Sequence, residues 1–228
     1  MKSLKALLLA SLALAFSAAA RAESSAQAWL ETYYLNPRPA ELSANVHSLS
    51  RTGWFDEEGH TAISIGFLSG VFAANPQRVN GWLEDLADLP LTHRRLIAAS
   101  LWQAGNPMGA EMLKRFAKNS VVRNEVLELA SRSSTPVSNT LVVSTSSMNL
   151  QWGAFLASGN ERHVVAILDG MGNDRAGLDI SARQTLAQNA VAHPRVLDIC
   201  RAQLSRQPES VRAEIRAALT AAGFKPGA

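Results

Sequence analysis

Residues 74–86 read ANPQRVNGWLEDL, and this stretch carries the pattern that decides the fold. Asn75 is a strong helix N-cap residue, and Pro76 suits the first helical position, where a backbone N–H has no partner within the helix. Apolar residues follow at offsets of 4, 7 and 11 from Asn75, which is the spacing of one helix face: Val79, Trp82 and Leu86. The stretch predicts a helix that begins at the Asn-Pro pair and buries one apolar stripe.

Similar junctions recur at Asn36-Pro37, Asn106-Pro107, Asn160-Glu161 and His193-Pro194, and each is predicted to open a helix. The spacings between successive junctions are 39, 31, 54 and 33 residues, as in stacked helical hairpins. The sequence therefore predicts an all-α fold of stacked antiparallel helical hairpins, either solenoid-like or an irregular α-α bundle. The predicted repeat core is Val79, Trp82, Leu86, Leu113, Trp152, Phe155, Val164, Ile167, Leu197, Cys200 and Leu204.

One segment carries a family resemblance. Trp152-Gly153, Phe155 and Ser158-Gly159-Asn160 resemble pieces of the tetratricopeptide pattern, and the architecture predicted for residues 62–204 resembles tetratricopeptide and Sel1-like helical repeats. The segment from Trp152 to Asn160 is also similar to uncharacterised exported bacterial proteins. The resemblance implies a helical fold and no particular activity.

The first 22 residues have the features of an export signal. Lys2 and Lys5 give a basic start, residues 6–16 form an apolar run, and Ala20-Arg21-Ala22 has the small-x-small pattern that signal peptidases cleave. The apolar run is shorter than the roughly 20 residues that cross a bilayer. We therefore expect a cleaved signal peptide over residues 1–22 and no stable membrane insertion afterwards. The expected location is periplasmic or secreted, in a bacterium.

The charge balance limits the classes of partner that the chain can bind, and the cysteine count limits the disulfides that it can form. The whole chain has 22 basic and 19 acidic residues, and the predicted signal contains Lys2, Lys5 and Arg21, so the remaining chain is balanced at 19 of each. A neutral chain without long basic runs does not favour nucleic acid as a partner. Cys200 is the single cysteine, which excludes an internal disulfide, and its apolar neighbours predict that it is buried.

The predicted helices fall into two regions. An N-terminal helical region covers residues 23–130, and a C-terminal helical region covers residues 150–228. Between them, residues 131–149 contain ten Ser or Thr residues and the apolar run Leu141-Val142-Val143, in which both valines are β-branched; this predicts a loop with a short extended piece. This segment is interpreted either as a flexible linker or as a loop that lies across the stack and fills its groove.

The densest set of chemical groups lies between Gly53 and Gly59 and just beyond. Two aromatic residues, three carboxylates and one histidine stand there: Trp54, Phe55, Asp56, Glu57, Glu58 and His60. Such a loop could form a partner-binding tip or supply a hydrolytic acid. Alternatively its aromatic rings enter the core and its carboxylates are solvated. No histidine pair has metal-binding helical spacing, and neither a metal nor another cofactor is predicted.

No catalytic constellation is recognisable in the sequence. Gly66-Phe67-Leu68-Ser69-Gly70 differs from the Gly-x-Ser-x-Gly nucleophile elbow and lies within a helical pattern. We expect a non-enzymatic helical-repeat protein that binds a protein or peptide, as an adaptor or assembly factor of the cell envelope. Two alternatives stay open: a secreted hydrolase acting through the acidic loop from Trp54 to His60, and a periplasmic inhibitor or immunity protein.

Overall fold

The structure is a computed structural model, and it describes residues 25–105, 111–114, 116, 123–132, 134–171 and 176–225. Every regular element in these ranges is helical, which confirms the predicted all-α class. The predicted signal peptide and the Asn106-Pro107 junction lie outside the described residues. None of the described helices is long and apolar enough to cross a membrane.

After a helical segment at residues 25–32, the described part of the chain contains α-helices and short 3₁₀ turns. The α-helices are α2 (Leu42–Arg51), α3 (His60–Ala74), α4 (Val79–Asp85), α5 (Leu91–Gln103), α7 (Arg123–Ser131), α8 (Thr145–Ser158), α9 (Glu161–Gly170), α10 (Ala176–Ala192), α11 (Pro194–Gln203) and α12 (Glu209–Ala221). The 3₁₀ turns are η1 (Tyr33–Leu35), η2 (Pro39–Glu41), η3 (Trp54–Asp56), η4 (Pro76–Arg78) and η5 (Val137–Asn139).

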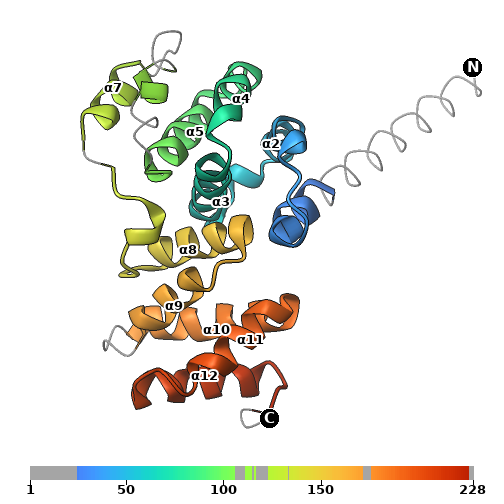
Figure 1. Cartoon of the computed structure of the whole chain (residues 1–228), viewed down its shortest axis with the longest axis vertical. Helices are drawn as coiled ribbons and strands as arrows, with labels where there is room; N and C mark the ends of the chain where they lie inside the picture. Colours follow the sequence, from blue (N-terminus) through green and yellow to red (C-terminus); the bar gives the residue numbers. More distant parts are fainter. Residues whose placement is uncertain are drawn as a thin grey trace, which may run out of the picture.

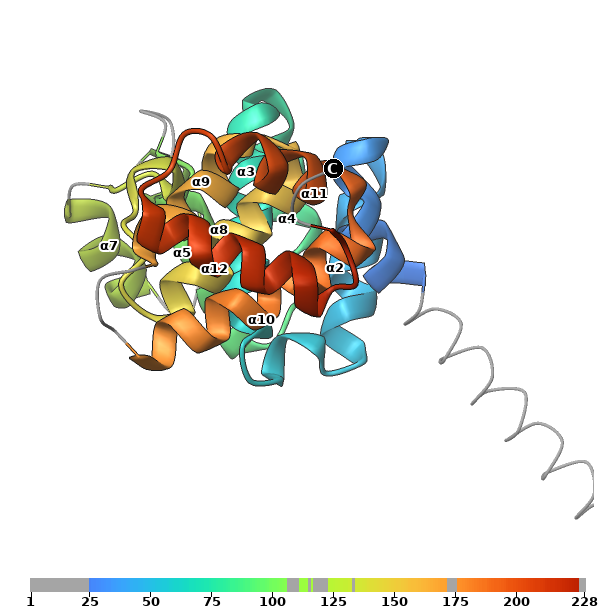
Figure 2. The same ribbon diagram turned by 90° about the horizontal axis from the view of Figure 1, so that it is seen from below.

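The helices form an elongated stack with α3 and α8 at its middle (Figure 1). Helix α3 packs on α5 and α8, α8 packs on α9, and α10 packs on both α11 and α12. Seen from below, α12 lies across the end of the stack beside α10 (Figure 2). The most extensive contact joins α3 to α8, which are far apart in the sequence. In a simple solenoid each repeat contacts only its neighbours, so the hairpin pattern did not predict this contact.

Small residues explain why α3 and α8 approach so closely. Gly66 and Gly70 of α3 face Gly153 and Ala157 of α8, and each pair is four residues apart along its helix. A Cβ atom added to Gly66 would lie far inside the 3.0 Å that real Cβ atoms keep, against a backbone carbonyl of α8. A Cβ added to Gly153 would meet a carbonyl of α3 in the same way. The backbones are therefore in direct contact, and only glycine fits at these two positions.

Two of the predicted junctions open helices as expected. Helix α9 begins at Glu161, and the side chain of Asn160 accepts a hydrogen bond of 3.1 Å from the backbone N–H of Arg162. Helix α11 begins at Pro194, directly after His193. Both junctions place the following apolar stripe toward the core, as the periodicity indicates.

The other two described junctions differ from the prediction. At Asn75 the turn η4 does begin at Pro76, but the Asn75 amide donates to the Val71 carbonyl at 2.9 Å and so caps the preceding helix α3. Asn36-Pro37 does not open a helix, because the next helical turn, η2, begins at Pro39. The Pro39 ring, two residues further on, occupies the first helical position in place of Pro37.

The predicted repeat-core residues lie in the interior or at its margin. Nine are at most 5% exposed: Val79, Trp82, Leu86, Leu113, Trp152, Phe155, Val164, Ile167 and Cys200. Leu197 and Leu204 are partly buried and pack against the same core. Burial raises the pKa of the Cys200 thiol to about 12, because the thiolate would lose its hydration.

We expect Cys200 to resist alkylation in the folded protein. At pH 8 a thiol with a pKa near 12 is ionised to only about one part in ten thousand, and the thiolate is the reacting species. Iodoacetamide should therefore label Cys200 in urea but not in buffer, as followed by intact-mass spectrometry. Equal labelling rates in the two conditions would show that Cys200 is accessible.

The Ser/Thr-rich segment is shorter than predicted and is packed against helices. Helix α7 extends to Ser131 and α8 already begins at Thr145, where a capping box of Ser144 and Ser147 fixes its first turn. Between the two helices, the side chains of Val137 and Val142 are each only 5% exposed. The segment is thus anchored at two points along its length.

Candidate functional site

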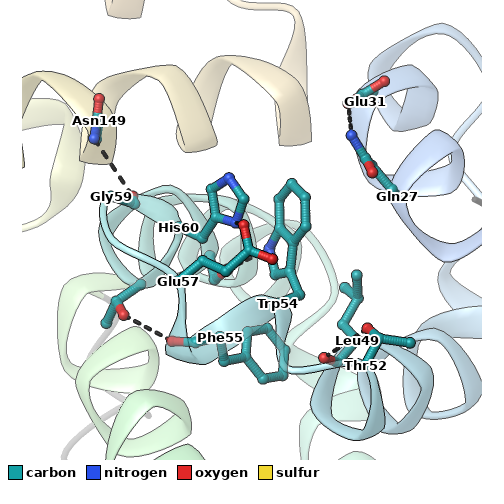
Figure 3. Close-up of polar contacts among 12 residues, drawn as sticks. Gln27, Glu31, Leu49, Thr52, Trp54, Phe55, Glu57, Gly59, His60 and Asn149 are labelled. Atoms are coloured by element: carbon teal, nitrogen blue, oxygen red, sulfur yellow. Dashed lines mark hydrogen bonds and ion pairs between the residues drawn. The ribbon is translucent and has the colours of Figure 1, made fainter. Parts of the chain in front are cut away.

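The loop from Trp54 to His60 is built between two left-handed glycines, Gly53 with φ 81° and Gly59 with φ 85°. The indole of Trp54 stacks on the imidazole of His60, with ring centroids 3.7 Å apart and planes at 16° (Figure 3). Phe55 is buried, and the Asn149 amide of α8 lies 3.4 Å from the Gly59 carbonyl that accepts its hydrogen bond. The loop is therefore well anchored.

The structure does not bring the three carboxylates of this loop together. Asp56 Oδ1 lies 3.2 Å from His93 Nε2, and Glu57 Oε2 lies 3.2 Å from His60 Nδ1. The second contact is within ion-pair distance, but its angles do not make it a hydrogen bond. Glu58 is exposed. The acids thus serve separate contacts and do not form one acidic site.

His93 joins this loop to two helices, a role that the sequence did not indicate. Its Nδ1 lies 2.8 Å from Ser50 Oγ at the end of α2, and its Nε2 is bound by Asp56. A catalytic Ser-His-Asp array needs an open serine and a buried carboxylate. Here the Asp56 side chain is 62% exposed, whereas the His93 side chain is only 6% exposed. The arrangement therefore fits a structural link between α2, η3 and α5, hereafter the brace, better than an activated serine nucleophile.

Two substitutions test the brace. We expect His93→Ala to lower the free energy of unfolding by about 2–3 kcal/mol, because it removes a buried ring and leaves its polar partners unmatched. Asp56→Ala should cost under about 1 kcal/mol, since its ion pair is largely exposed. Urea denaturation of both variants measures the difference. An equal, large loss in both would mean that the array acts as one unit.

An open groove of about 710 Å³ lies between residues 138–143 and helix α9. Leu141 and Val143 point outward at this groove and are 78% and 53% exposed, whereas Val142 between them is buried. This alternation is that of a strand with one covered and one open face. Of all the described residues, Leu141 is the most exposed among the large apolar side chains.

One face of α9 forms the opposite side of the groove. Arg162, Val165, Ala166 and Asp169 line it at steps of three and four residues. Val165 and Ala166 are half-buried, and the two charged residues are exposed. Asp169 Oδ1 also accepts a hydrogen bond of 3.2 Å from Gln207. The groove therefore has an apolar middle, Glu161 and Arg162 side by side at one end, and Asp169 at the other, about 10 Å from Arg162 along the helix.

A buried polar pair holds the segment that forms the first wall, residues 137–143, hereafter the wall segment. Gln151 Nε2 donates to the carbonyls of Val137 and Thr140, each at 2.8 Å. Gln151 Oε1 lies 2.7 Å from His163 Nδ1, which must donate because the amide oxygen can only accept. Gln151 is 0% exposed and His163 is 3% exposed. The wall segment is therefore fixed from beneath by side chains of α8 and α9.

His163 is neutral at pH 7 in this setting. Burial, together with the smaller effect of the positive charge of the adjacent Arg162, lowers the pKa of His163 to about 4. With Nδ1 donating, Nε2 carries the lone pair, and Arg162 Nε lies 3.4 Å from it. His163 is therefore neutral in the folded protein, with its single ring proton on Nδ1.

The sequence indicated only part of this site. The apolar run Leu141-Val142-Val143 predicted a short extended piece. Its position against α9 could not be predicted, because it results from tertiary packing. Gln151 and His163 carried no recognisable signal, because they meet only when α8 and α9 pack together. The predicted binding residues of the Trp54 loop lie in a different part of the molecule, in contact with α3 and α5.

In the part of the chain that the structure describes, no group of three or more His, Cys, Asp and Glu side chains could hold a metal ion.

Comparisons with known proteins assign neither a family nor a function to the chain. The chain matches no protein-family model, no curated protein and no solved structure. The function of the groove must therefore be inferred from its own residues.

Proposed function

We propose that the protein is an exported binding protein of the bacterial cell envelope, an adaptor or assembly factor, whose groove takes an extended segment of a protein partner. One observation carries this proposal. Leu141 and Val143 are strongly exposed on an extended stretch of backbone whose intervening residue is buried, beside an open groove. A partner that covers these apolar side chains removes their surface from water, and this burial favours binding.

An extended peptide suits the groove better than a helix would. Residues 141–143 of the wall segment present side chains with a period of two, and a second extended chain alongside would match that period and could add main-chain hydrogen bonds. Such strand addition gives affinity through the backbone and specificity through alternate side chains. The partner segment would therefore place every second residue against Leu141, Val143 and the Val165-Ala166 floor.

The charges on α9 define the ends of that partner segment. Arg162 and Asp169 are about 10 Å apart, a distance that about three extended residues span at about 3.3 Å each. An acidic side chain near Arg162 and a basic one near Asp169 would complement the groove. The expected partner segment is thus a short apolar stretch flanked by one acid and one base in a fixed order.

A displayed library of random decapeptides tests this proposal on the folded chain. The wild-type protein should enrich peptides with alternate apolar residues between an acid and a base. The double variant Arg162→Asp with Asp169→Arg should enrich the same apolar pattern with the two charges in reverse order. Enrichment without any pattern, or with an unchanged charge order in the swapped variant, would contradict the proposed site.

A matched pair of surface variants separates the groove from general stickiness. Leu141→Asp places a charge on the apolar wall and should abolish enrichment. Val191→Asp makes the same change at an exposed position of α10, where Val191 is 63% exposed, and should leave enrichment unchanged. Equal effects of the two variants would mean that the peptides bind elsewhere.

A further inference from the structure

The wall segment is supported by a buried polar arrangement in addition to the buried side chains of Val137 and Val142. Its own residues contain no charged side chain, and two of its carbonyls are held by the Gln151 amide. The orientation of that amide is in turn set by His163. Protonation of His163 at Nε2 would leave its Nδ1–H bond to Gln151 in place but would put a full charge on a ring that is 3% exposed.

We propose that Gln151 and His163 form an acid-sensitive latch: with His163 neutral the wall segment is closed, and protonation of His163 releases it and dismantles the groove. The consequence for a bound peptide rests on the proposed function, whereas the latch itself does not. In acid the wall segment would swing away from α8, and a peptide held against Leu141 and Val143 would dissociate.

Protonation is unfavourable in the closed state for two reasons. It places a full charge on a ring that is 3% exposed, and it turns Nε2 into a donor facing the guanidinium of Arg162 at 3.4 Å. Among the neighbouring elements, α8 and residues 136–144 contain no titratable side chain, and the two acids of α9 itself, Glu161 and Asp169, are exposed. Helices α11 and α12 also pack near α9, and the structure pairs none of their charged side chains with His163: Arg195, Asp198, Arg201, Glu209, Arg212, Glu214 and Arg216.

The direction of the pH effect follows from the two states of the histidine. The pKa of His163 is about 4 when the latch is closed, and an opened, hydrated imidazole has an ordinary pKa of about 6.5. The closed state is therefore fully favoured above pH 6.5, and its population relative to the open state decreases as the pH falls toward 4. Relative to pH 7, the ratio of closed to open should fall about 25-fold at pH 5 and about 100-fold at pH 4.

Amide hydrogen exchange of the full chain without peptide tests the latch. The amides of Thr140 and Val143 are hydrogen-bonded in the closed state, to Val137 O at 3.0 Å and Ser147 Oγ at 2.9 Å. Their protection factors, corrected for the intrinsic pH dependence, should fall by the stated ratios, while amides of the α3–α8 interface keep theirs. Constant protection from pH 7 to pH 4 would overturn the latch.

Two variants keep the test decisive. His163→Asn retains a donor near Nδ1 but does not titrate, so its protection should be independent of pH. Arg162→Gln removes the neighbouring cation, which brings the pKa of His163 in the closed state nearer to its ordinary value, so protection should fall less in acid than in the wild type. The same pH response in all three proteins would overturn the proposal. Because no peptide is present, an opening latch combined with failed peptide selection at pH 7 would reject only the proposed function.

Discussion

Gly153→Ala is expected to lower the free energy of unfolding by about 3 kcal/mol or more, which would make it one of the most damaging single-methyl changes in the chain. The added Cβ would overlap a backbone carbonyl of α3, and a carbonyl within a helix cannot move aside as a flexible side chain can. Gly66→Ala should have a similar effect from the opposite side of the interface. Urea denaturation with a two-state fit measures both changes.

Gly81→Ala is the matched control, because Gly81 lies within α4 and an added Cβ meets nothing within 4 Å. Alanine is a better helix former than glycine, so this variant should be more stable than the wild type by about 0.5–1 kcal/mol. If Gly153→Ala also proved neutral or stabilising, the close contact of α3 and α8 would be wrong. The position of α8, and with it the groove, would then need revision.

Gln151→Leu is expected to lower the free energy of unfolding by about 3 kcal/mol and to expose the wall segment. The substitution keeps the volume close to that of glutamine but leaves the carbonyls of Val137 and Thr140 and the Nδ1–H of His163 without their partners. An unmatched buried polar group costs about 1–3 kcal/mol. These costs do not simply add, because the wall segment can detach and its polar groups can then bind water. Part of the lost stability should therefore appear as local opening of the wall segment.

Gln188→Leu is a suitable control, since Gln188 is an exposed residue of α10 and its replacement should change stability by less than about 0.5 kcal/mol. Hydrogen exchange should show faster exchange at residues 137–143 in Gln151→Leu and no change there in the control. A fully protected wall segment in Gln151→Leu would show that other contacts, such as the buried side chain of Val142, hold it unaided.

Much of the fold could be predicted from local patterns. The Asn160 cap and the apolar stripe containing Val164 and Ile167 define α9 correctly, because capping and periodicity depend on residues that are neighbours in sequence. Helix α11 followed from His193-Pro194 for the same reason. These elements needed no knowledge of tertiary contacts.

The central contact could not be predicted in that way. The small residues of Gly66–Gly70 and Gly153–Ala157 indicate close helix packing once their partner is known, but nothing in their spacing identifies that partner. The candidate groove has the same limitation. Leu141 and Val143 were recognisable as an extended piece, whereas the acid-sensitive pair beneath them forms only when Gln151 and His163 are brought together by the packing of α8 on α9.

The Trp54 loop shows that neighbours in sequence need not form one cluster in the structure. Its aromatic and acidic residues lie close together in the sequence, yet Trp54 stacks on His60, and Asp56 and Glu57 pair with different histidines. His93, which organises part of the loop, stands outside it in the sequence. A cluster in sequence is therefore not a cluster of available groups, because the contacts made by the surrounding helices decide which groups remain open.

Photo-crosslinking in cells that produce the protein tests the groove most directly, with a photoreactive residue at Leu141 and, separately, at Val191. We expect one dominant partner captured from Leu141, with the crosslink mapped to an extended apolar segment between an acid and a base, and no such product from Val191. Capture that is equal at the two positions, or absent at Leu141 in well-folded and abundant protein, would contradict the assignment of the groove as the binding site.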